Sequence, residues 1–160
     1  MSSMIRRRRD GTFIQAFHSG ISTLLVDLGD QLDDMLDSDT PELRRLFPTA
    51  YTDDEEKDAG YQILARSSLT DQRRAAIETV RRTAENEVLT EDELTDWMAL
   101  TNDLRLVLGT RLDVSEDDDG SEIDPTSPEA NLMEIYHVLG AVLHEIVAAL
   151  SSALPRGGTD

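Results

Sequence analysis

Two histidines and a glutamate near the carboxyl end have the spacing closest to a metal site. Glu134 and His137 form one Glu-x-x-His pair, and His144 follows seven residues after His137 on the same helical face. Di-iron helical bundles use two such pairs and two further glutamates, whereas this chain has one pair. We therefore predict no metal and no cofactor. A metal-dependent bundle enzyme using Glu134 and His137 remains the less favoured alternative.

The sequence also lacks the residues required for calcium binding, phosphate binding, nucleophilic catalysis and thiol chemistry. An acidic stretch resembles the start of a calcium loop, but Ser115 stands at its first position and Thr126 replaces the bidentate glutamate. There is no Gly-rich phosphate loop and no nucleophile in a strand-turn-helix context. The absence of cysteine excludes disulfides, thiolate zinc sites and thiol redox chemistry. We predict that the protein is not an enzyme.

Arginines at four consecutive positions, Arg6, Arg7, Arg8 and Arg9, form the only basic block in the chain. They precede Asp10-Gly11, which is typical of a two-residue hairpin turn. One interpretation is a basic arm that contacts nucleic-acid phosphates, and any DNA contact should then be weak and salt-sensitive. The favoured interpretation is an edge hairpin whose charges discourage strand pairing or meet the acidic body.

Composition narrows the classes of partner. Thirty-three acidic and fifteen basic residues give a formal net charge of -18, which repels DNA and anionic membranes at long range. This negative electrostatic field favours binding of basic protein partners, or it serves only to keep the protein soluble. No apolar run approaches the roughly 20 residues of a membrane helix, and no apolar stretch directly follows the N-terminal arginines. We expect a cytoplasmic protein with no membrane contact, and one domain over residues 1–160.

The stretch from Thr90 to Leu112 is the predicted organising helix. Thr90 and Glu93 have the spacing of a capping box, and acidic residues fill the first turn. Apolar residues recur at spacings of three and four on one face, which carries the only tryptophan, Trp97. Leu100, Leu106 and Val107 widen the apolar arc, so we expect this helix to be central and Trp97 to be buried.

Polar residues inside this helix are the candidate structural or binding residues, together with Trp97: Asn102, Asp103, Arg105 and Arg111. A buried arginine needs a carboxylate, because an unpaired buried charge is costly. We expect each charge to pair with another element; the carboxylates considered for the two arginines are Asp27, Asp30, Asp34, Glu134 and Glu145. The alternative is an open pocket in which Arg105 awaits an anionic ligand.

The remaining pattern predicts a mainly α fold, a single-domain bundle of about five to six helices with a short N-terminal β-hairpin over residues 4–17. Helices are expected over about 18–36, 42–47, 53–66 and from about Thr70 to Val88, with a last helix from Pro128. Residues 113–128 are predicted to be an acidic loop, and residues 155–160 a flexible tail.

The last helix is apolar on most of its circumference. It carries one face of large apolar residues, and alanines and valines on much of the rest. Such a helix is either central or pairs with a second subunit. We predict a homodimer that uses some of the residues Val138, Ala141, Val142, Ala149 and Ala153.

Two segments carry a family resemblance: TPELRRLFPTAYTDD over residues 40–54 and WMALTNDLRLVLGTRL over residues 97–112. They resemble the actinobacterial domain-of-unknown-function proteins encoded beside the ClpS proteolysis adaptor, one branch of which comprises AosR-like oxidative stress transcriptional regulators. The likeness covers nearly the whole chain. It implies a cytoplasmic, non-enzymatic regulator, but a cysteine-free chain cannot sense oxidant through thiols.

The resemblance implies a transcription-associated stress regulator, and the acidic composition favours one that acts mainly through protein contacts. The alternative is a structural or adaptor module linked to Clp proteolysis, which rests on the resemblance alone. In both cases the expected partner is a protein of the transcription or proteolysis machinery.

Overall fold

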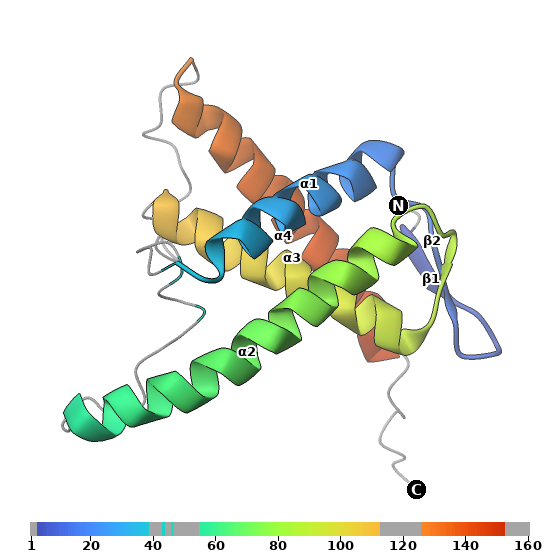
Figure 1. The fold of residues 1–160 in the computed structure, drawn as a ribbon. Coiled ribbons are helices and arrows are strands. Elements are labelled where there is room, and N and C mark those ends of the chain that lie inside the picture. Colours follow the sequence, from blue (N-terminus) through green and yellow to red (C-terminus); the bar gives the residue numbers. More distant parts are fainter. Residues whose placement is uncertain (1–2, 39–42, 44–45, 47–54, 113–125, 153–160) are drawn as a thin grey trace, which may run out of the picture.

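The computed structural model describes residues 3–38, 43, 46, 55–112 and 126–152, which form a helical bundle with a small sheet at one end (Figure 1). The elements, in chain order, are β1 (Ile5–Arg7), β2 (Phe13–Gln15), α1 (Ser19–Met35), α2 (Glu55–Thr83), β3 (Val88–Leu89), α3 (Glu91–Arg111) and α4 (Pro128–Ser152). The mainly helical class is confirmed. The expected helix count of five to six is wrong, because the described residues form four helices.

The difference in helix count has a local cause in α2. We expected one helix to end near Arg66 and another to begin near Thr70, but α2 is continuous across both. Neither proline nor glycine stands between them, so nothing interrupts the backbone hydrogen bonds. The expected short helix over residues 42–47 lies largely outside the described residues, where only Leu43 and Leu46 are placed, both buried.

The hairpin closes through a longer loop than the sequence suggested. Backbone bonds from Arg8 N to Thr12 O (2.7 Å) and from Gly11 N to Arg8 O (3.1 Å) define a three-residue loop, where we expected a two-residue turn. Gly11 has φ +86°, a left-handed conformation that glycine adopts without steric penalty. This matches the three-residue hairpin that ends in a left-handed glycine.

A third strand completes the sheet, in the order β1-β2-β3 with antiparallel pairs. The sequence did not predict β3, because we expected Val88 to be the last inward-facing residue of the preceding helix. Instead α2 ends at Thr83, and Gln15 N donates to Glu87 O at 2.9 Å as the chain enters β3. Two residues are too few to show a strand pattern in the sequence.

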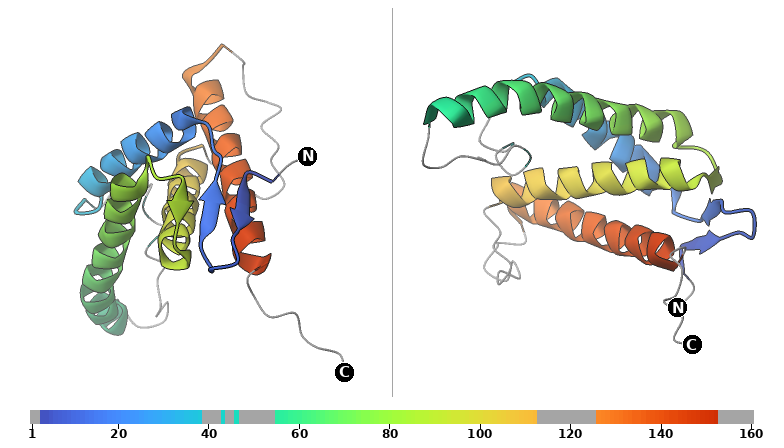
Figure 2. Two further views of the ribbon diagram at one scale, coloured as in Figure 1. Left: turned by 90° about the vertical axis from the view of Figure 1, so that its right-hand side faces the viewer. Right: turned by 90° about the horizontal axis from the view of Figure 1, so that it is seen from below.

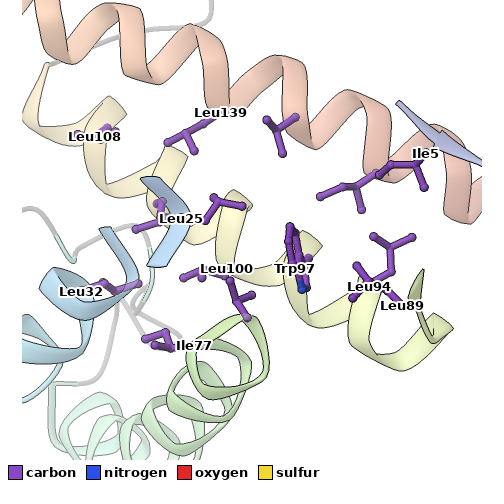
Figure 3. Packing of buried hydrophobic residues seen from close by; sticks show 14 of the residues in the cluster. Ile5, Leu25, Leu32, Ile77, Leu89, Leu94, Trp97, Leu100, Leu108 and Leu139 are labelled. Carbon is purple, nitrogen blue, oxygen red and sulfur yellow. The ribbon is translucent and has the colours of Figure 1, made fainter. Parts of the chain in front are cut away.

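Helix α3 lies between α2 and α4, and α1 also packs against it (Figures 1 and 2). The predicted capping box is confirmed, with Glu93 N donating to Thr90 Oγ1 at 3.1 Å and Thr90 N to Glu93 Oε2 at 3.3 Å. Trp97 is completely buried, as predicted. Figure 3 shows Trp97 in a continuous layer of buried side chains that runs from Ile5 of the sheet to Leu139 of α4. The organising role of α3 is confirmed.

Ion pairs join α1 to α2. Arg74 Nε donates to Asp33 at 2.8 Å and Arg74 Nη2 to Asp37 at 2.7 Å, and Arg81 binds both Asp30 and Glu78. These hydrogen bonds to carboxylates raise the pKa of both arginines. The side chains of these pairs are largely exposed, so solvent screens them and they contribute little to stability.

The remaining sequence expectations concern the ends of helices. Helix α4 begins at Pro128 as predicted. Of the predicted acidic loop and tail, residues 113–125 and 153–160 lie outside the described residues.

Candidate functional site

Among the charged residues that the structure describes, Asp103 is the most deeply buried, with 9% of its surface exposed. Its Oδ2 lies 3.4 Å from Nε of Arg73 on α2. The same guanidinium donates from Nη2 to the Leu46 carbonyl at 3.0 Å. Asp103 therefore finds its partner on another element, as expected, and the pair joins α3 to α2 and to the segment that precedes α2.

Burial dominates the acid–base chemistry of Asp103. Removal of the carboxylate from water raises its pKa from 3.8 to about 6, although the nearby charge of Arg73 opposes the shift. A carboxyl that titrates near neutral pH can act in catalysis, but it needs access to substrate. The carboxylate of Asp103 forms the ion pair with Arg73 that joins α3 to α2, so we assign it a structural role.

Arg105 meets an aromatic ring where we expected a carboxylate. Its guanidinium carbon lies 4.7 Å from the centre of the Tyr136 ring on α4. Its buried Nε has no hydrogen-bond partner among the described residues, and the expected pairing with an α1 or α4 carboxylate is wrong. The guanidinium is weakly hydrated and polarisable, so it can stack on the face of an aromatic ring. Gly140 makes this possible, because a Cβ at that position would lie 3.2 Å from Arg105 Nε.

The other polar residues of α3 lie apart from this pair. Asn102 and Arg111 are exposed, and Arg111 borders a small cavity of about 80 Å³ between α1 and α3. Trp97 donates from Nε1 to Thr83 Oγ1 at 2.8 Å inside the core. The structure therefore does not bring the predicted set Trp97, Asn102, Asp103, Arg105 and Arg111 into one site.

The possible metal ligands lie on the outside of α4. Glu134, His137 and His144 are all exposed. Within the described residues, no three His, Cys, Asp or Glu side chains come together in a way that could hold a metal ion.

We expected no stretch of membrane-helix length, but helix α4 is long and apolar enough to cross a membrane by length and composition alone, with a mean hydropathy of 1.4 over its most apolar window; core helices of soluble proteins meet the same criteria. One of its sides packs on α3 and β1. That side includes Val142 and Ala149, which belong to the core of this chain and are not free for a second subunit. Ala141 and Val147 are exposed, and Ala153 lies outside the described residues.

The small sheet has one covered and one open face. Ile5, Phe13 and Leu89 are buried on the inner face. Successive strand residues alternate between faces, so their neighbours Ile14 and Val88, which pair in register, point outward. Val88 is 39% exposed, and Met4, next to β1, is 45% exposed. We name Met4, Arg6, Ile14 and Val88 the outer sheet face.

The predicted basic block borders this face. Arg6 lies opposite Ile14 in the register, and all four arginines from Arg6 to Arg9 are exposed. Among described residues their one ion pair is Arg8 with neighbouring Asp10, at 3.8 Å. The sequence identified the arginines but missed the apolar part of the surface, because Val88 joins it through a strand pair between distant residues.

The fold and these surfaces define a helical protein with an N-terminal sheet, an apolar and basic sheet face, and buried charges that join its helices. The chain belongs to the family described as Domain of unknown function (DUF2017), whose model matches residues 2–150. No curated protein and no solved structure matches the chain significantly.

Proposed function

We propose that the protein is a non-enzymatic, cytoplasmic regulator that acts mainly through protein contacts, and that the outer sheet face binds an acidic segment of its partner. The observation that carries the proposal is the combination of exposed Met4 and Val88 with exposed Arg6 on the same face, next to the other exposed arginines of the block. Exposed apolar side chains rimmed by charge are typical of protein interaction sites.

Charge selects the kind of partner. The chain has a net charge of -18, so a generally acidic protein is repelled from most of its surface. The arginines from Arg6 to Arg9 attract carboxylates locally, and arginine binds carboxylates in a bidentate geometry. A partner segment that combines acidic and apolar side chains therefore fits this face.

We propose a role in stress regulation because residues 40–54 and 97–112 resemble a family with a branch of oxidative stress transcriptional regulators. The alternative is an adaptor of the Clp proteolysis machinery, and it is supported by the same resemblance. Identification of the bound protein distinguishes the two.

Photo-crosslinking from the outer sheet face tests the proposal. A benzophenone amino acid replaces Val88 in one variant and exposed Asp71 of α2 in the matched control. We expect Val88 alone to crosslink to an acidic segment of one protein, and replacement of Arg6 to Arg9 by serine to abolish the product. A third probe at Val147 reports the predicted homodimer through crosslinks between two copies.

The outcome decides between the candidate roles. A product that belongs to the transcription machinery supports the regulator, whereas one from the proteolysis machinery supports the adaptor. Identical products from Val88 and Asp71, or crosslinks to nucleic acid, would contradict docking of an acidic protein segment.

A further inference from the structure

Helix α4 has one side that the proposed function leaves without a role. Its other side packs on α3 and β1, through buried residues that include Leu139, Val142, Ile146 and Ala149. Only 28% of the most apolar window of α4 is buried. The right-hand view of Figure 2 shows α4 along one edge of the bundle, with α3 beside it. A long apolar helix is therefore partly uncovered.

The uncovered side also has very few charges. Residues 135–152 contain no lysine, arginine or aspartate and one glutamate, Glu145, although 30% of the whole chain is charged. Glu145 is already bound, because its Oε2 accepts from Met4 N at 3.0 Å and from Ser3 Oγ at 3.1 Å. The exposed side of α1, in contrast, carries aspartates along its length. An exposed surface that is depleted of charge is typical of a protein contact site.

The exposed residues of α4 have the spacing of a contact between two helices. They recur at alternating intervals of three and four, which keeps them in line when one helix pairs with another. We name them the α4 seam: Glu134, His137, Ala141, His144, Ala148 and Ser151, all exposed. Val147, which is 43% exposed, lies beside the seam. The two alanines allow a second helix to approach closely.

A second copy of this chain is the occupant that the α4 seam fits. The net charge of -18 makes two copies repel each other over most of their surfaces. The repulsion is weakest where charges are fewest, which is at the α4 seam. A twofold contact brings the same surface together from both copies, so the seam has to be complementary to itself.

Charge decides which orientation of the two helices is complementary. In a parallel pair, Glu134 lies against Glu134 of the second copy, and like charges in contact are unfavourable. In an antiparallel pair, the register that sets Glu134 opposite His144 also sets His137 opposite Ala141. A histidine N–H donates to a carboxylate, and the small alanine leaves room for the histidine ring.

We propose that two copies of the chain form an antiparallel, twofold dimer through the α4 seam, with Glu134 of each copy against His144 of the other. The dimer presents two outer sheet faces, which strengthens binding to a partner that carries two acidic segments. The contact itself uses no residue of the outer sheet face. The inference therefore does not rest on the proposed function.

A charge exchange tests the contact between Glu134 and His144. Sedimentation velocity of the full chain, from about 1 µM to about 1 mM, measures the dimer dissociation constant. We expect Glu134→Lys and His144→Glu each to weaken the dimer at least about tenfold, because each change occurs twice in a twofold contact. The double variant restores opposite charges and should return the dissociation constant to within about threefold of the wild type.

The matched control is Asp71→Lys, which makes the same change of charge at an exposed position of α2. It should leave the dimer at least as stable as in the wild type, because it lowers the net negative charge without touching the seam. Circular dichroism checks that every variant remains folded.

A distance between spin labels tests the orientation. The chain has no cysteine, so Ser151→Cys gives a single position for a label. The antiparallel register is centred on residue 139, and the two labels are then about 36 Å apart along the helix axis. In a parallel pair they are about 10 Å apart. Double electron–electron resonance distinguishes these distances.

Several results would overturn the inference. A chain that stays monomeric at about 1 mM, a dimer that Glu134→Lys leaves unchanged, a double variant that is not restored, or labels about 10 Å apart would each contradict it. A monomer that binds vesicles of phosphatidylcholine would also contradict it, because a lipid surface would then cover the seam. Loss of the crosslink from Val88 alone would contradict the proposed function and leave the dimer standing.

Discussion

The face of α3 that packs on α2 and the face that packs on α4 differ in the kind of contact that their polar side chains make. Toward α2, polar groups meet polar groups: Trp97 donates to Thr83, Thr79 donates to Asp96 at 2.7 Å, and Asp103 lies beside Arg73. Toward α4, the half-buried guanidinium of Arg105 lies over the Tyr136 ring. Directional bonds spaced along α2 and α3 fix the register of these helices, whereas the contact with α4 depends mainly on shape and on the small size of Gly140.

The largest expected effect on stability is at Trp97, which belongs both to the apolar core and to the polar contacts between α3 and α2. Trp97→Ala should lower the free energy of unfolding by about 3–5 kcal/mol, because it opens a cavity and removes the bond to Thr83. Trp97→Phe keeps most of the apolar volume and should cost about 1–2 kcal/mol. Urea unfolding measures both, and equal stability of the alanine variant and the wild type would show that α3 is not central.

The second prediction tests the buried charge of the α2-facing network. Because the pKa of Asp103 is raised to about 6 from 3.8, the folded chain binds this proton more tightly than the unfolded chain does. Its contribution to stability is therefore fully present below pH 3.8 and is lost as the pH rises through about 6. Two pKa units correspond to about 3 kcal/mol.

Urea unfolding at several pH values measures this contribution against Asp103→Asn, in which the titration is absent. Between about pH 4 and pH 7, the stability of the wild type should fall relative to the variant by about 2–3 kcal/mol. The other carboxyl groups are common to both proteins and cancel in the difference. A constant difference across this range would show that Asp103 is not buried as the structure places it.

The smallest effect tests the α4-facing contact through two helical glycines. A Cβ at Gly60 of α2 meets nothing within 4 Å, so Gly60→Ala should stabilise the chain by up to about 1 kcal/mol through helix propensity. The same change at Gly140 brings the Cβ to 3.2 Å from Arg105. We expect Gly140→Ala to be about 1 kcal/mol less favourable than Gly60→Ala. Equal melting temperatures of the two variants would argue against close packing there.

The sequence predicted those features of the fold that depend on neighbouring residues. The capping box at Thr90 and Glu93, the start of α4 at Pro128 and the burial of Trp97 followed from local spacing. Each involves residues within one or two helical turns, or a face defined by helical periodicity. The candidate site was predicted less well. Arg6 to Arg9 were identified, but the apolar residues that complete the outer sheet face were not.

What the sequence by itself determined is therefore the mainly helical class, the start of α4 and the cap and buried face of α3, because these follow from short-range geometry. Only the tertiary structure decided the partners of its charges. Asp103 is thirty residues from Arg73, and Tyr136 is thirty-one from Arg105, so no periodicity links them. The same holds for β3, whose two residues become a strand only because β2 offers a paired edge. These pairings between residues far apart in the sequence depend on how the helices and strands pack against one another.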